Sequence, residues 1–312
     1  MRKLLFPLFL CLMLLAGCGS QPAAHSGENT VAFTDDTGVE ISVPRHPQTV
    51  AVLTSSLADL WLTAGGAVDI TVGETVERGF TDKTVVLVDD GAGKTVNLEA
   101  LIAAEPDFVL YSSDLSGQLE CADALHNAGI PAAGFAVETF EDYLKLLKIC
   151  TEILDTPENY EQYGQQVKER VDDLIAAAQG QKEQPSILFV RAGSSAKYTK
   201  AKTARNHFVC VMLDALGTKN IADVAPILLD GLSIEEILLA DPDDILFTTM
   251  GDEATGLAYM DSLLADPVWQ SLTAVETGRV YSLPKEWFQY KPNSQWDRAY
   301  AYLIELLYGD IV

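Results

Sequence analysis

The feature that most constrains the fold is an internal repeat of helix, Pro-Asp and strand. Residues 97–110 read NLEALIAAEPDFVL and residues 233–246 read SIEEILLADPDDIL. In each copy a capping residue, Asn97 or Ser233, precedes an apolar helical pattern, and Pro-Asp ends the helix before a buried strand. The copies begin 136 residues apart, which predicts two similar α/β lobes. The alternative is coincidence, because this unit is common in α/β proteins.

Strands alternate with helices on both sides of the middle of the chain, as in mostly parallel sheets. The expected strands lie at residues 50–53, 84–88, 108–111, 132–135, 186–190, 244–248 and 279–282, and the expected helices at 55–62, 98–104, 121–128 and 296–307. Residues 31–43 predict a β-hairpin that turns at residues 36–38. The predicted fold class is therefore α/β, with two similar lobes of mostly parallel sheet.

The middle of the chain has a different pattern. Residues 139–180 carry almost no strand signal, and their apolar residues recur at helical spacing, with Pro157 in the first turn of a second segment. This stretch predicts a long backbone helix that joins the lobes. We therefore expect an N-terminal lobe over residues 31–138, the linking helix over 139–180 and a C-terminal lobe over 181–312.

The first residues indicate export. A short basic segment, Arg2 and Lys3, precedes an apolar run that is too short to span a membrane. The run ends in Leu-Ala-Gly-Cys18, which resembles the lipobox of bacterial lipoproteins, in which the cysteine carries the lipid. We expect residues 1–17 to be a signal peptide and residues 18–30 a lipidated, flexible tether. The alternative is an ordinary secretory signal in which Cys18 is incidental.

Charge and cysteine content exclude several classes of partner. The formal net charge is −24, which disfavours nucleic acid and any adhesion to anionic lipid beyond the anchor. Cys121, Cys150 and Cys210 remain in the body of the chain, without the spacing of a zinc site. A disulfide between Cys121 and Cys150 is possible, but buried free thiols are the preferred interpretation.

No motif of catalysis is present. The sequence has no GxSxG, no phosphate-binding GxxxxGK[ST] and no GxGxxG after a strand. Of its four histidines, His25 lies in the predicted tether and His46 in a loop between two prolines, which leaves His126 and His207. We therefore expect a protein that is not an enzyme and has no metal site. A lipid-anchored hydrolase is the rival from another class, and it lacks an assembled nucleophile and base.

Positive charge is concentrated in one stretch. Residues 185–213 contain no Asp or Glu. They begin with the predicted buried strand at residues 186–190, and the basic residues of the stretch follow this strand. Loops at the carboxyl ends of such strands form the ligand crevice of open α/β sheets, and basic side chains there bind anionic groups. We therefore expect ligand contacts from Arg191, Tyr198, Lys200, Lys202, Arg205 and His207. The alternative is a surface loop that balances local charge.

A second candidate wall contains aromatic residues. Residues 284–296 combine three aromatic side chains with two lysines after a predicted strand, and Trp287 and Tyr290 are its candidates for stacking on a planar ligand. They could equally fill the core of the C-terminal lobe. On the N-terminal side the corresponding loops contain Ser55 and Arg78, and Arg78 is placed to face the basic stretch.

The chain resembles the substrate-binding lipoproteins of bacterial ABC importers for iron–siderophores, haem and corrinoids. The resemblance covers nearly the whole mature chain. It is carried by the order and spacing of FTDDTGVEISVP, VAVLTSSLADLWLTAG, NLEALIAAEPDFVL, AGIPAAGF, LDALGTKNIAD and LSIEEILLADPDDI. It implies two α/β lobes joined by a single long helix, with the ligand between them. It also implies a monomer on the outer face of the cell membrane, attached only by its lipid.

The resemblance implies partners as well. Family members place one exposed glutamate on each lobe against an ABC permease dimer with a cytoplasmic ATPase, and Glu99 and Glu235 occupy the matching repeat positions. The ligand is expected to be a ferric siderophore or related metal chelate, and no resident cofactor is expected. Arginine and aromatic contacts typical of siderophore binders would come from Arg78, Arg191, Arg205, Tyr198 and Trp287. Haem or a corrinoid such as cobalamin is the alternative ligand.

Overall fold

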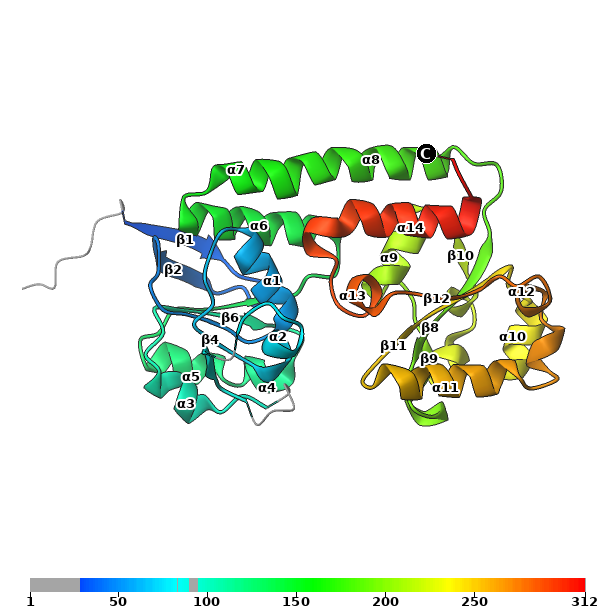
Figure 1. The fold of residues 1–312 in the computed structure, drawn as a ribbon, viewed down its shortest axis with the longest axis horizontal. Coiled ribbons are helices and arrows are strands. Elements are labelled where there is room, and N and C mark those ends of the chain that lie inside the picture. The colour runs from blue at the N-terminus through cyan, green and yellow to red at the C-terminus, as the bar shows by residue number, and fades with distance from the viewer. Residues whose placement is uncertain (1–28, 83, 90–94, 312) are drawn as a thin grey trace, which may run out of the picture.

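The structure, a computed structural model, describes residues 29–82, 84–89 and 95–311. Cys18, the predicted signal peptide and nearly all of the predicted tether lie outside these residues. Two α/β lobes lie side by side, with a layer of helices along one side of both (Figure 1). This arrangement confirms the predicted fold class. Within the described residues, no helix has the length and apolar character needed to cross a membrane.

The N-terminal lobe contains an all-parallel sheet of five strands in the order β5-β4-β3-β6-β7. Its strands are β3 (Val50–Val52), β4 (Ile70–Thr71), β5 (Val86–Leu87), β6 (Phe108–Ser112) and β7 (Ala132–Phe135). Its helices are α1 (Ser55–Thr63), α2 (Gly73–Glu77), α3 (Leu98–Ala103), α4 (Ser116–Leu119) and α5 (Ala122–Asn127). The predicted hairpin is confirmed as β1 (Thr30–Thr34) paired with β2 (Glu40–Pro44). The short elements β4, α2 and α4 were not predicted.

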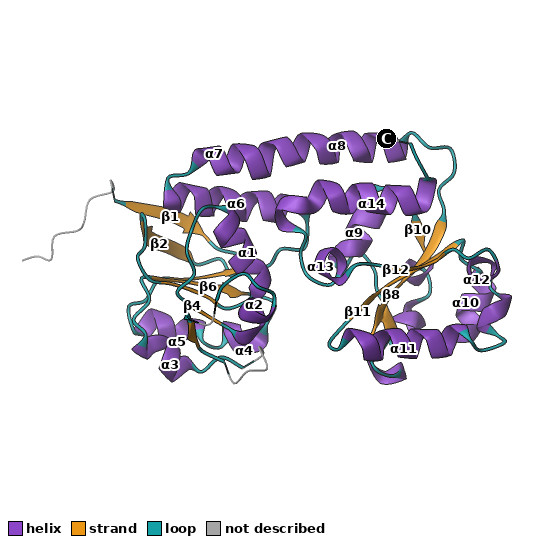
Figure 2. Cartoon of the chain, viewed as in Figure 1, coloured by secondary structure: helices purple, strands orange, loops and turns teal. Residues whose placement is uncertain are grey.

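The C-terminal lobe contains a second sheet (Figure 2), and its strands lie in the order β10-β8-β11-β12. Strand β9 pairs antiparallel with β8. Its strands are β8 (Ser186–Ala192), β9 (Lys200–Ala201), β10 (Lys219–Asn220), β11 (Asp244–Thr249) and β12 (Val280–Ser282). Its helices are α9 (Phe208–Ala215), α10 (Ile234–Ala240), α11 (Glu253–Leu264), α12 (Thr273–Glu276) and α13 (Lys285–Phe288). Short 3-10 turns lie at Ala196–Tyr198, Ile221–Asp223, Pro226–Leu229, Trp269–Ser271 and Asn293–Gln295.

The internal repeat is a structural repeat. Helix α3 leads into β6 and α10 leads into β11, and in both copies the residue before the proline, Glu105 or Asp241, has a positive φ, 48° and 41° respectively. This conformation turns the chain sharply from helix to strand. Asp107 then accepts hydrogen bonds from the backbone just before β3, and Asp243 accepts them at the start of β8. In each lobe, the aspartate that follows the proline therefore binds the start of the neighbouring strand, β3 or β8.

The predicted linking helix over residues 139–180 is a helical hairpin, which corrects the expectation of a single helix. Helix α6 (Phe140–Leu154) ends at Asp155, whose φ of 54° reverses the chain. The second limb begins with Pro157 and runs through α7 (Pro157–Tyr160), a π-helical turn (Glu161–Gln165) and α8 (Gln166–Gln179). It extends along both lobes, and α14 (Trp296–Tyr308) packs against α8 (Figure 1).

The largest hydrophobic core is continuous from one lobe to the other through these helices. At the junction Phe140 of α6 and Phe208 of α9 both contact the ring of Trp296, with centroid distances of 5.7 and 6.0 Å. Trp296 is therefore a core residue. Cys121, Cys150 and Cys210 are buried free thiols, so the preferred interpretation of the cysteines is confirmed and the disulfide is not formed.

Candidate functional site

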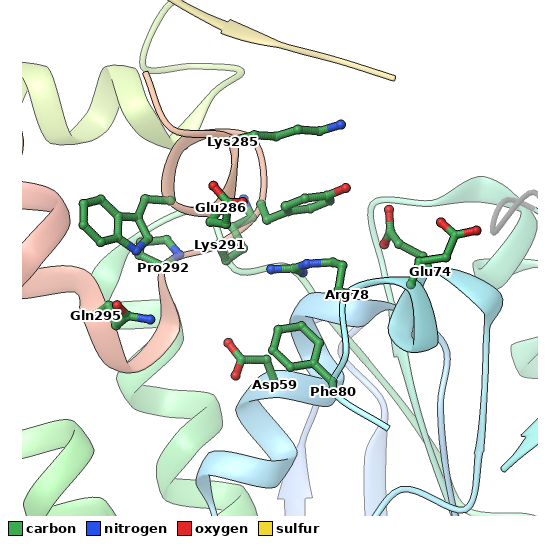
Figure 3. Close-up of a pocket in the computed structure, with 12 residues that line it drawn as sticks. Asp59, Glu74, Arg78, Phe80, Lys285, Glu286, Lys291, Pro292 and Gln295 are labelled. Carbon is green, nitrogen blue, oxygen red and sulfur yellow. The ribbon is translucent and has the colours of Figure 1, made fainter. Parts of the chain in front are cut away.

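A cavity of about 540 Å³ lies between the two lobes. One wall is formed by α1, α2 and the residues after α2, and the other by α13 and the loop that leads to α14 (Figure 3). Its lining residues are Asp59, Glu74, Glu77, Arg78, Phe80, Lys285, Glu286, Trp287, Tyr290, Lys291, Pro292 and Gln295. The cavity is thus built from segments more than two hundred residues apart in sequence.

Arg78 is held between the lobes by stacking. Its guanidinium carbon lies 3.8 Å from the ring centroid of Tyr290 in the C-terminal lobe and 4.6 Å from that of Phe80 in its own lobe. Its Nη1 donates to Ser55 Oγ at 2.9 Å, and the Ser55 hydroxyl donates to Glu74 at 2.5 Å. Burial lowers the pKa of Arg78, and the surrounding Tyr290 and carboxylates oppose that shift. The guanidinium is therefore oriented before any ligand arrives.

Behind the cavity, the loop before α14 is fixed to α1. The amide of Asn293, which is buried and has a φ of 49°, donates to the Ser56 carbonyl at 2.9 Å and to the Asp59 carboxylate at 2.7 Å. Burial raises the pKa of Asp59, and the hydrogen bond from Asn293 lowers it. These contacts join the lobes at the inner end of the cleft.

Lys291 provides a second link between the lobes. Its Nζ donates to Glu138 at 2.7 Å and lies 4.2 Å from the ring centroid of Phe208. Burial lowers the pKa of this ammonium, whereas the ion pair with Glu138 raises it. The charge of Lys291 is therefore already balanced within the protein.

The structure brings together four of the predicted ligand residues. Arg78, Trp287 and Tyr290 line the cavity, and Ser55 lies buried directly behind Arg78. Trp287 also packs edge-on against Phe288. From the sequence, Arg78 is expected to face the basic stretch; in the structure it stacks instead on Tyr290 of the aromatic wall.

The basic stretch is placed differently. Arg191 lies at the end of β8 and donates through Nε to Gln289 at 3.2 Å, while Lys200 and Lys202 lie at and after β9; none of the three lines the cavity. Arg205 is exposed and its charge acts on Asp223, on another part of the lobe. The predicted single basic wall is therefore not part of this cavity.

Tyr198 and His207 also lie outside it. Tyr198 is 49% exposed and lines a separate hollow of about 250 Å³ with Met250 and Gly251. The Nζ of Lys285, which lines the interlobe cavity, donates to the Gly251 carbonyl of this hollow. His207 is buried and caps α9, with Nδ1 accepting from the backbone of Val209 at 3.3 Å. Its role in this structure is that of a helix cap.

The acidic lining of the cavity was not predicted from the sequence. Asp59, Glu74, Glu77 and Glu286 all border the cavity. Acidic residues are so numerous in this chain that most are interpreted as solvated surface. The only available signal was their position in the same segments as Arg78 and Trp287.

The predicted docking residues occupy corresponding positions on the two lobes. Glu99 and Glu235 are exposed and lie in the first turns of α3 and α10. Asn97 caps its helix through a hydrogen bond from Ala100, whereas the Ser233 hydroxyl donates to Glu235 instead of capping.

Two similar α/β lobes thus flank the interlobe cavity. The described residues contain no group of three or more His, Cys, Asp or Glu side chains that could hold a metal ion. The chain belongs to the family described as periplasmic binding protein, whose model matches residues 50–287. This family is a class of transport proteins that work outside the cytoplasm. No curated protein matches the sequence.

Solved structures share the fold at low sequence identity. The apo haem-binding protein RhuT from Roseiflexus sp. RS-1 has a TM-score of 0.69 and 20% identity, with 83% of this chain and 97% of that chain covered. A solute-binding protein from Veillonella parvula has a TM-score of 0.70 and 22% identity, covering 91% and 88%. SirA from Staphylococcus aureus, complexed with staphyloferrin B, has a TM-score of 0.68 and 18% identity, covering 89% and 98%.

Proposed function

We propose that this protein is the extracytoplasmic substrate-binding component of an ABC importer, and that it delivers a ferric siderophore or related metal chelate to the permease. The observation that carries the proposal is the interlobe cavity lined by Arg78, Trp287 and Tyr290. Its size suits a small-molecule ligand. The structural relatives support the ligand class, because SirA is described with staphyloferrin B and BauB with a ferric acinetobactin complex.

The binding experiment uses Trp287 as its reporter, since its side chain lines the cavity. We expect a ferric siderophore to change tryptophan fluorescence with saturation at one site. Haem is the alternative, supported by the relatives RhuT and HmuT, and a visible absorption band in the purified protein would identify it; cobalamin is tested in the same titration. If ferric siderophores, haem and cobalamin all leave the fluorescence unchanged, the proposed ligand class is wrong.

Delivery to the permease is assigned to Glu99 and Glu235. Both carboxylates are exposed at equivalent positions of the repeat, so basic pockets on two permease subunits would receive them in the same manner. We further propose that a lipid on Cys18 keeps the protein beside the permease and raises its effective concentration there. Cys18→Ala should release the protein from the membrane fraction, and a variant that stays bound to membranes would contradict the anchor.

A further inference from the structure

The cations that line the interlobe cavity already have partners. Arg78 is stacked between Phe80 and Tyr290 and donates to Ser55. Lys285 donates to the Gly251 carbonyl at 2.6 Å, and Lys291 is paired with Glu138. Of these three cations, Lys291 is thus neutralised by a carboxylate, whereas Arg78 and Lys285 are each held in place by one N–H bound to a neutral oxygen.

The carboxylates of the cavity are less committed. Glu77 and Glu286 are exposed and make no hydrogen bond or ion pair with the described part of the chain. They come from opposite walls, Glu77 from α2 and Glu286 from α13. Together with Asp59 and Glu74 they give the lining four carboxylates against three cations. Glu77 and Glu286 therefore leave negatively charged acceptors uncommitted on both walls, and the lining as a whole carries net negative charge.

The remaining cations of the C-terminal lobe do not reverse this balance inside the cavity. Arg191, Lys200 and Lys202 do not line it, and the Arg191 Nε is bound to Gln289. Phe80 and Tyr290 already stack on Arg78, and the cavity also presents the ring of Trp287, whose face can attract a further cation. Free carboxylates and aromatic rings together recognise a positively charged, N–H-rich group.

We propose that the cavity selects a metal chelate that carries positive charge, such as a ferric hydroxamate complex with a pendant ammonium, and discriminates against polyanionic chelates. This inference rests on the proposed function and specifies its substrate class. Like charges brought together in a cleft repel one another, which is the physical basis of the discrimination. A polyanionic tris-catecholate would meet Glu77 and Glu286 as the ligand entered.

The test compares ferric chelates of different charge on the intact folded protein. The probes are a monocationic linear trihydroxamate, an uncharged cyclic trihydroxamate and a trianionic tris-catecholate, with dissociation constants from tryptophan fluorescence. We expect the cationic complex to bind at least about tenfold more tightly than the trianionic one. Its affinity should fall as salt rises from about 0.05 to about 0.5 M, because screening weakens the attraction.

Variants assign the preference to its residues. The pair Glu77→Gln with Glu286→Gln should reduce the ratio of the two affinities at least about threefold. The control pair Glu161→Gln with Glu276→Gln makes the same charge change at exposed positions of the π-helical turn and α12, and should leave the ratio unchanged. Lys200→Gln with Lys202→Gln should also leave the affinities unchanged.

The outcomes separate the two proposals. Tightest binding of the trianionic complex, or a large loss in the Lys200 and Lys202 pair with none in the glutamate pair, overturns the inference while leaving a metal-chelate receptor in place. Equal binding of all three complexes also overturns the charge selection. Absence of binding by every chelate, including haem and cobalamin, overturns the proposed function and the inference with it.

Discussion

Replacement of Asn293 tests how the lobes are joined. Asn293→Ala removes the donor to the Ser56 carbonyl and the donor to Asp59. The first bond contributes about 1 kcal/mol and the second, to a carboxylate, about 2 kcal/mol. Alanine at the positive φ of this position costs about 1 kcal/mol more than asparagine. We therefore expect the variant to lower the free energy of unfolding by about 4 kcal/mol near neutral pH.

The pH dependence of this loss provides a second readout. Burial raises the pKa of Asp59 and Asn293 opposes that shift, so removing the amide raises the pKa of Asp59 further in the folded protein. An acid whose folded pKa lies above its unfolded value contributes stability that is present at low pH and lost as pH rises through the folded pKa. The penalty of Asn293→Ala should therefore be smaller at about pH 4.5 than at about pH 7.

Urea unfolding, followed by far-ultraviolet circular dichroism, measures both quantities. Asn293→Gly is the matched control, because glycine accepts the positive φ and should recover about 1 kcal/mol of the loss while still lacking both hydrogen bonds. A loss below about 1 kcal/mol for Asn293→Ala at neutral pH, or a penalty that grows in acid, would refute the assignment of Asn293 as the buried link between the lobes.

Three further predictions concern the site and its surroundings. Trp287→Ala should lower ligand affinity about tenfold and remove most of the fluorescence response, whereas Trp287→Phe should retain most of the affinity; titration of both by calorimetry checks this. Burial holds the pKa of His207 well below its usual value, so folding stability should fall as pH drops below about 6.5, where only the unfolded chain takes up the proton; His207→Asn should flatten this dependence in urea titrations, and an unchanged profile would contradict it. Glu99→Ala combined with Glu235→Ala should abolish uptake into cells without changing the ligand dissociation constant, and a parallel loss of ligand binding would show that the variant acts elsewhere.

The sequence by itself determined the two-lobed α/β architecture. The repeat at residues 97–110 and 233–246 carries the same local signals in both copies, because each helix ends at Pro-Asp before an apolar strand. The structure keeps the left-handed residues Glu105 and Asp241 at equivalent places in both copies. Local patterns also located the aromatic wall around Trp287, but they placed Arg78 opposite the basic stretch, whereas it stacks on Tyr290 of that wall.

Only the tertiary structure decided which charged side chains remain free to contact a ligand. Composition marked residues 185–213 as basic, but it could not show that Arg191 binds Gln289 or that Lys291 is paired with Glu138. Nor could periodicity show that Asp155 folds the central helix back on itself. These features depend on contacts between residues distant in sequence, and the energy of such contacts is set by burial and geometry that no local pattern contains.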